Sequence, residues 1–385
     1  MSIIIVGKLI AGRMMHNDAL SVHRRSVINR CRFHPHGAGA SGNVHMKCLP
    51  LILIITLIAL AHAQDQSITV GSIDFYGSAG LYVDKVRAAL PLREGDKLSH
   101  ELKDQTIDTI KQAVRQVTGR EPSDVASVCC DERGRLLIYV GLRRNERAQR
   151  VQYNPLPRGS IRLPPLAIKV YTEADEALSN AVARGVSGQD VSQGYALSVE
   201  PEARAKGLAL HDYAVRNARL LRRVLSSSQD AGQRQIAAEM VGYTDSSREQ
   251  ISALVRASRD VDAGVRNNAL RALGVIASSK PSVAARLPAE SFIELLNSGI
   301  WTDRNKSAMV LSALTEQRNP RLLARLRAQA LDSLLEMARW HSPYHSSTPR
   351  LILGRIAGID EKDLAKMIAS GEVEPIIKAL SSQKK

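Results

Sequence analysis

An internal repeat constrains the fold of this 385-residue chain more than any other feature. The pattern Asp-Ala-Gly-x-Arg-x-x-Ala, followed further along by Gly, occurs twice, with the copies starting at Asp230 and Asp262. Repeats with a period of about 20–50 residues indicate stacked units, each of which buries its apolar face only against its neighbours. The sequence therefore predicts a stack of similar helical units around these two positions.

Each shared position of the repeat has a physical role in such a stack. The aspartates can cap a helix by accepting hydrogen bonds from otherwise unpaired backbone N–H groups. The arginines can bind an Asp or a backbone carbonyl of the next unit, and the alanines let two helices approach closely. We expect Gly242 and Gly274 to end their helices in a left-handed conformation. The predicted stacking residues are Asp230, Arg234, Ala237, Asp262, Arg266 and Ala269.

This pattern resembles the HEAT-repeat family of armadillo-like proteins. From Tyr171 onward every periodic segment has helical spacing, so the resemblance covers roughly residues 171–385. It implies an all-α, right-handed solenoid that acts in protein–protein interaction. The unit at Asp303 keeps Ala308 but lacks the Asp–Arg pair, so it is a degenerate copy.

Residues 64–143 predict a small α+β module ahead of the solenoid. Its expected elements are a strand at Ile68–Phe75, helices at Tyr82–Leu90 and His100–Thr118, and a hairpin of Val125–Cys130 with Leu136–Leu142. This β-α-α-β-β order, with a Gly-Asp-x-Leu-Ser link between the helices, resembles a POTRA module. That resemblance implies docking of polypeptides, with a partner strand added to the sheet edge. A generic α+β domain is the alternative.

Residues 144–170 form an Arg- and Pro-rich connector between the two parts. Its four prolines exclude a continuous helix, so we expect an extended, semi-rigid linker laid along the first helical repeat. A proline-rich recognition segment is the alternative.

Met46–Ala63 has the features of a secretory signal peptide: Lys47, a mainly apolar core at Leu51–Leu60, and a small-x-small end. The core is shorter than the roughly 20 residues of a membrane span. Cleavage and export to the periplasm or cell envelope are therefore predicted, with retention as a membrane anchor as the alternative. Residues 1–45 show no periodic pattern and are interpreted as a non-structural extension.

Positive charge is concentrated on one predicted helix. The net charge of +15 includes seven Lys/Arg and one acid in residues 1–63, and the remainder carries 46 basic and 37 acidic side chains. Arg216, Arg219, Arg222 and Arg223 lie within about two turns. They predict either a solvated face with ion pairs or a stripe for an acidic partner or anionic membrane surface. Nucleic acid is disfavoured because no aromatic residues interleave with the arginines.

Cys129 and Cys130 are the only cysteines after residue 63. Alternation along a strand predicts one buried and one exposed thiol. In an oxidising compartment the two can instead pair with each other or with another chain.

No catalytic site can be assigned from the sequence. His341 and His345 have the spacing of helical metal ligands, but Pro343 between them favours a structural turn in a loop. No G-x-S-x-G elbow, phosphate-binding loop or dinucleotide fingerprint occurs. We therefore predict no catalytic residue, metal, cofactor or small-molecule substrate.

The sequence as a whole predicts an exported, non-catalytic scaffold that binds a polypeptide along the concave face of the solenoid. The four arginines of residues 216–223 and Trp340 are the candidate partner-binding residues, because Arg and Trp are favoured interface anchors. Packing between repeats is the alternative role of Trp340. An enzyme or lyase built on a HEAT-like solenoid and a structural brace of an envelope assembly are the competing functions.

Overall fold

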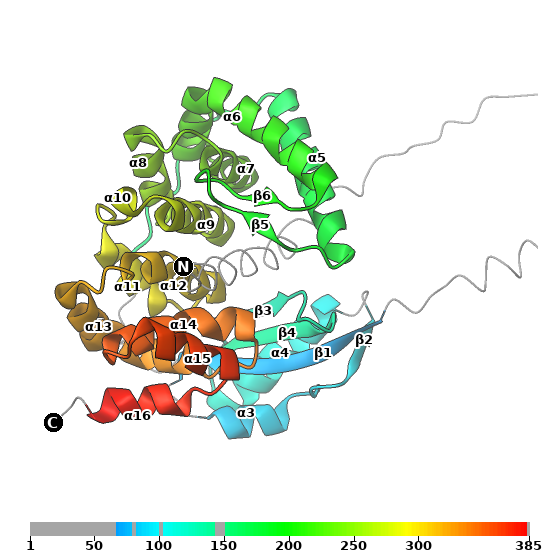
Figure 1. Ribbon diagram of the computed structural model, residues 1–385. Coiled ribbons are helices and arrows are strands. Elements are labelled where there is room, and N and C mark those ends of the chain that lie inside the picture. Colours follow the sequence, from blue (N-terminus) through cyan, green and yellow to red (C-terminus); the bar gives the residue numbers. More distant parts are fainter. Residues whose placement is uncertain (1–66, 79–81, 100–102, 143–150, 383–385) are drawn as a thin grey trace, which may run out of the picture.

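The computed structural model describes residues 67–78, 82–99, 103–142 and 151–382. Within these ranges a small sheet with two helices comes first and a mostly helical part follows, giving 14 helices in all (Figure 1). The predicted division into an α+β part and a helical part is therefore confirmed. The predictions for residues 1–45 and 46–63 fall outside the described residues. None of the helices in the described ranges is both long and apolar enough to cross a membrane.

The N-terminal sheet is mixed, with its four strands in the order β2-β1-β4-β3. The strands are β1 (Ser67–Tyr76), β2 (Lys97–Ser99), β3 (Asp124–Val128) and β4 (Leu136–Gly141). β1 runs parallel to β4, while β2 and β3 are antiparallel to their neighbours. Helices α3 (Val83–Ala89) and α4 (Lys103–Thr118) lie close to their predicted positions. The predicted link between these helices contains the additional strand β2, because residues 97–99 pair with the start of β1.

Both faces of this sheet are buried, as the central strand β4 shows. Leu136, Ile138 and Val140 pack with α3 and α4 in the core of the module. Leu137 and Tyr139 point the opposite way and belong to the core of the helical part. Successive strand residues alternate between faces, so one strand joins two hydrophobic cores. The module is therefore packed against the helices as well as tethered to them.

Consecutive helices of the helical part pack in pairs: α6 with α7, α8 with α9, α11 with α12, and α13 with α14. We call α7, α9, α12 and α14 the second helices, and each packs on the next. The helices are α5 (Pro165–Ala183), α6 (Pro201–Ser227), α7 (Ala231–Gly242), α8 (Arg248–Ala257), α9 (Ala263–Ser279), α10 (Pro281–Ala284), α11 (Ala289–Leu296), α12 (Trp301–Leu314), α13 (Pro320–Ala338), α14 (Pro343–Ile356), α15 (Glu361–Ser370) and α16 (Glu374–Ser382). A hairpin of β5 (Gln189–Asp190) and β6 (Leu197–Ser198) lies between α5 and α6.

The glycines of the repeat do not end helices in the left-handed region, so that prediction was wrong. Neither Gly242 nor Gly274 has a positive φ, and α9 continues beyond Gly274 to Ser279. A Cβ at Gly242 would lie 2.8 Å from the Cβ of Ala272, and one at Gly274 would collide with the side chain of Met309. These glycines instead let neighbouring second helices approach closely.

The connector ends earlier than predicted, because α5 begins at Pro165 and not at Tyr171. Proline suits this first helical position, where a missing N–H removes no helical hydrogen bond. Residues 151–164 follow the first repeat only in part, because they cross the start of α12 and the turn before α9 before they reach α7. Their partners include Tyr153 Oη to Asp303 (2.9 Å), Asn154 N–H to the Arg259 carbonyl (2.6 Å) and Leu163 N–H to Gln233 (2.6 Å).

Candidate interaction surface

Two buried arginines of the repeat connect successive helix pairs. Arg234 donates two hydrogen bonds to Asp260, at 2.9 and 2.8 Å, and Arg266 binds Asp303 in the same way, at 2.7 and 3.0 Å. The side chains of all four residues are at most 8% exposed. Paired hydrogen bonds between charged groups are strong and geometrically specific. These four residues link successive helix pairs, and their burial leaves them inaccessible to a binding partner.

The other residues of the repeat lie where the same helices begin and meet. Asp230 accepts from Gln233 N–H at the start of α7, and Asp262 accepts from Val265 N–H at the start of α9. Ala237 and Ala269 are fully buried.

A third arginine, Arg304, occupies the same structural position in α12 and was missed in the sequence. It donates to the carbonyl of Ser298 (2.6 Å) and to Glu336 (3.2 Å). Arg234 and Arg266 also donate to the carbonyl six residues before them. At the N-cap position of α12, where the other two copies have Asp, this copy has Ile300. A Ser or Asp six residues before a helical Arg is the signal common to all three copies.

Aromatic side chains join the N-terminal module to the helical part. Tyr139 of β4 stacks on Trp301 (ring centroids 4.8 Å apart) and packs on Trp340 (4.9 Å). Its hydroxyl lies 2.6 Å from Nδ1 of His345. Trp340 is only 2% exposed. Its proposed role as a surface anchor was therefore wrong, because its ring is covered by the chain's own module.

Polar groups flank this aromatic junction. Asp124 of β3 accepts hydrogen bonds from the Trp301 backbone N–H (2.9 Å) and from Tyr76 Oη (3.1 Å), and burial raises the pKa of its carboxyl. Asp74 of β1 lies 2.8 Å from Nδ1 of His341, and this hydrogen bond raises the pKa of the imidazole. The junction thus adds directional contacts to apolar packing.

The two histidines have different partners, in β1 and β4. His345 lies in the first turn of α14, because Pro343 occupies a position near the helix start that suits proline. The prediction of a loop was therefore wrong for His345. Among the residues that the structure describes, no group of three or more His, Cys, Asp or Glu could hold a metal ion.

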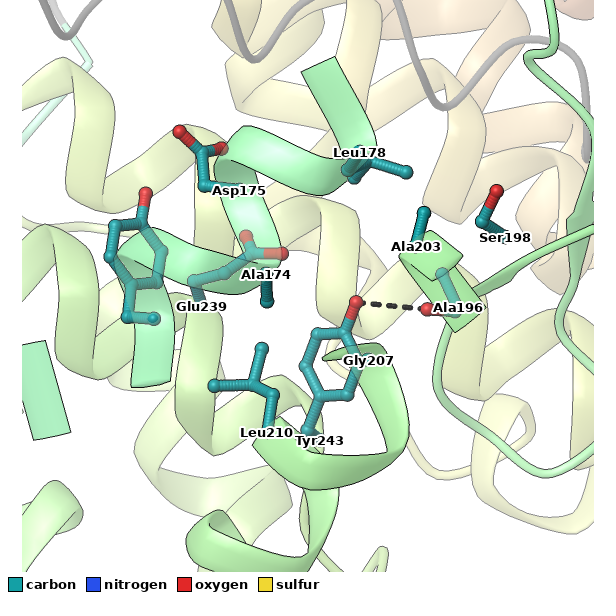
Figure 2. Close-up of a pocket in the computed structure, with 11 residues that line it drawn as sticks. Ala174, Asp175, Leu178, Ala196, Ser198, Ala203, Gly207, Leu210, Glu239 and Tyr243 are labelled. Atoms are coloured by element: carbon teal, nitrogen blue, oxygen red, sulfur yellow. Dashed lines mark hydrogen bonds between the residues drawn. The ribbon is translucent and has the colours of Figure 1, made fainter. Parts of the chain in front are cut away.

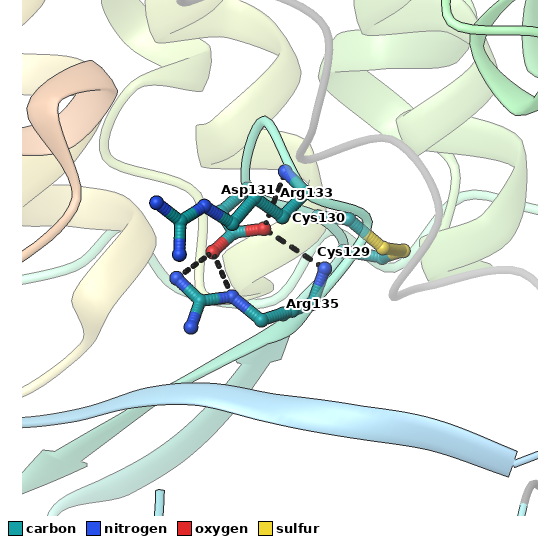
Figure 3. The surroundings of a disulfide bond; sticks show 5 residues. All are labelled: Cys129, Cys130, Asp131, Arg133 and Arg135. Atoms are coloured by element: carbon teal, nitrogen blue, oxygen red, sulfur yellow. Dashed lines mark hydrogen bonds and ion pairs between the residues drawn. A yellow bond between two sulfur atoms is a disulfide. The ribbon is translucent and has the colours of Figure 1, made fainter. Parts of the chain in front are cut away.

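Cys129 and Cys130 form a disulfide with each other at the end of β3 (Figure 3). Both are half-buried, so the expected division into one buried and one exposed thiol was wrong. The strand ends at Val128, and the alternation of faces does not extend to the cysteines. Beside them Asp131 accepts hydrogen bonds from Arg133 and Arg135. Although partial burial opposes the effect, these bonds lower the pKa of its carboxyl.

A small cavity lies between α5, α6 and α7 (Figure 2). Its lining includes Asp175, Glu239 and Tyr243, and the hydroxyl of Tyr243 donates to the Ala196 carbonyl at 2.8 Å. Burial raises the pKa of Tyr243 to about 12. Arg271 binds Glu239 at 2.6 Å. The cavity volume of about 30 Å³ suits a water molecule and is far below that of a typical ligand pocket.

A larger and more open groove lies between α6 and α8, with a volume of about 420 Å³. These are the first helices of two successive helix pairs, α6–α7 and α8–α9. We call it the arginine groove. The residues lining it are Arg219, Arg222, Arg223 and Ser226 from α6, and Arg248, Glu249, Ser252 and Arg256 from α8. Three of the four predicted arginines are therefore brought together, while Arg216 lies one turn earlier, exposed and outside the lining. Arg248 and Arg256 were missed because α7 separates them from α6 in the sequence.

Parts of the chain itself occupy the side of the second helices where a partner was expected. Val191 of the β5–β6 hairpin packs with Val275 of α9 and Met309 of α12. The N-terminal sheet covers Trp301 and Trp340 further along, through Tyr139 of β4. The arginine groove lies on first helices, away from both of these contacts.

Compared with known protein families and curated proteins, the sequence matches neither a family model nor a curated relative.

Proposed function

We propose that this chain is an exported, non-catalytic scaffold whose helical part is a HEAT-like, right-handed α-solenoid that holds a polypeptide partner. The observation that carries the proposal is the series of buried contacts from Arg234, Arg266 and Arg304 to carboxylates of later elements. Each contact ties one helix pair to the next, as stacked repeats require. Such a stack provides an extended, pre-organised surface, which lowers the entropic cost of binding an elongated partner.

The N-terminal module resembles a POTRA module in sequence, and in this proposal it stabilises the scaffold and fixes its orientation. Its sheet is covered on both faces, so only strand edges remain for β-augmentation. The aromatic junction makes the module and the helices move together. A partner bound to the helical part is thereby held at a fixed position relative to the module.

Crosslinking in intact cell envelopes, followed by mass spectrometry, tests the scaffold. We expect one abundant protein to be linked to peptides of residues 165–382. A small-molecule adduct would support the enzyme or lyase instead. Many minor crosslinks without a dominant protein would support a structural brace. Recovery of the chain without any linked protein would refute the scaffold.

Export is tested separately by fractionation and N-terminal sequencing of the chain from cells. The signal-peptide pattern predicts a mature protein that begins at Gln64 and occurs in the envelope or periplasmic fraction. Recovery of a chain that keeps residues 46–63 in the membrane fraction would support the anchor. A cytosolic chain would contradict export.

A further inference from the structure

We infer that the arginine groove binds an acidic polypeptide segment of the partner. This inference rests on the proposed function, because it specifies the chemistry of the polypeptide that the scaffold would hold. Five arginines line the groove and only one carboxylate, Glu249, lies among them. The groove therefore has a large excess of positive charge on a surface shared by two helices.

The arginines of the groove are not used inside the protein. Among the described residues, none accepts a hydrogen bond or forms an ion pair with the guanidinium groups of Arg219, Arg222, Arg223, Arg248 or Arg256. Exposed arginines elsewhere do pair: Arg325 with Glu290 at 3.1 Å and Arg339 with Glu374 at 3.5 Å. Of the alternative, a solvated face with ion pairs, the groove has the solvent exposure but, among the described residues, not the ion pairs.

Concentrated like charges repel one another, and a bound anion relieves that repulsion. Guanidinium groups hold carboxylates through two parallel hydrogen bonds, which point charges such as lysine do not form. All of the basic residues that line the groove are arginines. Carboxylates spaced along a peptide would therefore find several matching donors, with the hydroxyls of Ser226 and Ser252 beside them.

The shape of the site favours a polypeptide over a membrane or a nucleic acid. Arginines stand on both helices that border the groove, so an extended chain lying between α6 and α8 can reach both sets. None of the described residues lining the groove is aromatic, so stacking platforms for nucleic-acid bases are missing there.

Neighbouring groups extend the surface at both ends. Val215 lies one turn before Arg219 on α6, and its side chain is 44% exposed. At the other end, the Gly159 N–H of the linker donates to the Ser227 carbonyl, and the adjacent Arg158 is exposed. The surface therefore fits an acidic segment that also carries an apolar residue.

The binding test uses the purified full chain and a fluorescein-labelled poly-glutamate peptide, followed by fluorescence anisotropy. We expect saturable binding that weakens with salt. Arg219→Glu/Arg222→Glu should weaken it more than about tenfold, because two charged hydrogen-bond donors are replaced by repelling carboxylates. Arg222→Lys should have a smaller effect, because lysine keeps the charge but not the paired geometry.

A matched control separates the groove from net charge. Arg321→Glu/Lys362→Glu changes the formal charge equally at two exposed positions outside the groove. This control should bind within about twofold of the unchanged chain, because screening limits the effect of distant charges. Circular dichroism of both variants checks that they fold. Absent binding by the unchanged chain, or equal weakening in both variants, would overturn the inference.

Phosphatidylglycerol vesicles and single-stranded oligothymidine replace the peptide in parallel titrations. Groove-dependent binding of either, without binding of poly-glutamate, would assign the surface to a membrane or nucleic acid and overturn the inference. The envelope crosslinking experiment separates the two proposals. If Arg219→Glu/Arg222→Glu still captures the dominant partner, the inference about the arginine groove is refuted but the scaffold function stands. If the unchanged chain captures no partner, the scaffold function itself is refuted.

Discussion

Replacing Arg266 with methionine should destabilise the protein by about 3–5 kcal/mol, the usual effect of removing one partner from a buried ion pair. Asp303, which is 0% exposed, would lose both hydrogen bonds from the guanidinium group. Its carboxylate would keep only Ser298 Oγ (2.7 Å) and Tyr153 Oη (2.9 Å) as donors in this network. The large effect therefore comes from leaving a charge buried with incomplete compensation.

The same substitution at Arg325 is the matched control. Arg325 pairs with Glu290 at 3.1 Å, but their side chains are 58% and 41% exposed. Exposed pairs contribute about 0–1 kcal/mol, because solvent screens the attraction. Arg325→Met should therefore cost no more than about 1 kcal/mol. The chemical change is identical in the two variants, so their difference reports the burial of the Arg266–Asp303 pair together with the hydrogen bonds of Arg266 to the Asp260 and Val261 carbonyls.

A double variant, Arg266→Met/Asp303→Leu, tests the mechanism directly. It removes both buried charges, so much of the lost stability should return relative to Arg266→Met alone. Coupling between neighbouring sites of this kind is read from a double-mutant cycle.

Urea unfolding followed by far-UV circular dichroism and tryptophan fluorescence measures these effects. The chain has two tryptophans, Trp301 and Trp340, and both lie in the junction, so fluorescence reports on that region. Non-coincident transitions would show that the junction and the helices unfold separately. Equal midpoints and slopes for Arg266→Met and Arg325→Met would refute the reasoning. So would additive losses in the double variant.

Two further predictions concern helix contact and pH. Gly242→Ala should cost about 1–3 kcal/mol by overpacking against Ala272. Gly232→Ala is the control: the position is exposed, and the added Cβ would lie 3.3 Å from the Asp230 carboxylate, so the gain in helix propensity of up to about 1 kcal/mol is partly offset and the net change should be small. Thermal unfolding compares the two variants, and equal effects would exclude close packing as the reason. The hydrogen bond to Asp74 raises the pKa of His341 above its usual 6.5, so the stabilisation is complete below that value and is lost as pH rises through the folded-state pKa. Unfolding midpoints should therefore fall modestly above neutral pH, and a similar fall in His341→Gln would contradict this assignment.

Local patterns were informative where the interacting groups are close in sequence. Hydrophobic spacing located α3, α4 and most later helices, because helix periodicity is a local property. The same property accounts for the length of α6, which runs unbroken from Pro201 to Ser227 because neither a further proline nor a left-handed glycine interrupts it. At the cysteines, by contrast, the local pattern gave a wrong prediction. The predicted strand Val125–Cys130 extended two residues beyond Val128, where β3 ends.

The candidate surface could be found only in part from the sequence. Three arginines of α6 were identified because they share one helix. Arg248 and Arg256 joined them only when α6 and α8 packed side by side. Trp340 was misassigned for the related reason that a tryptophan at an interface and one in a core have the same local sequence signal. Its burial depends on Tyr139, which is about 200 residues away along the chain.

The amino-acid order by itself determined a small sheet-containing part, a long helical part and two of the three arginines that link helix pairs, Arg234 and Arg266. Only the tertiary structure decided that the module covers Trp301 and Trp340, that the linker crosses the starts of three second helices, and that five arginines meet in one groove. Periodicity describes which side of one element is apolar or charged. It cannot specify which distant element meets that side, because this choice depends on packing among all of them.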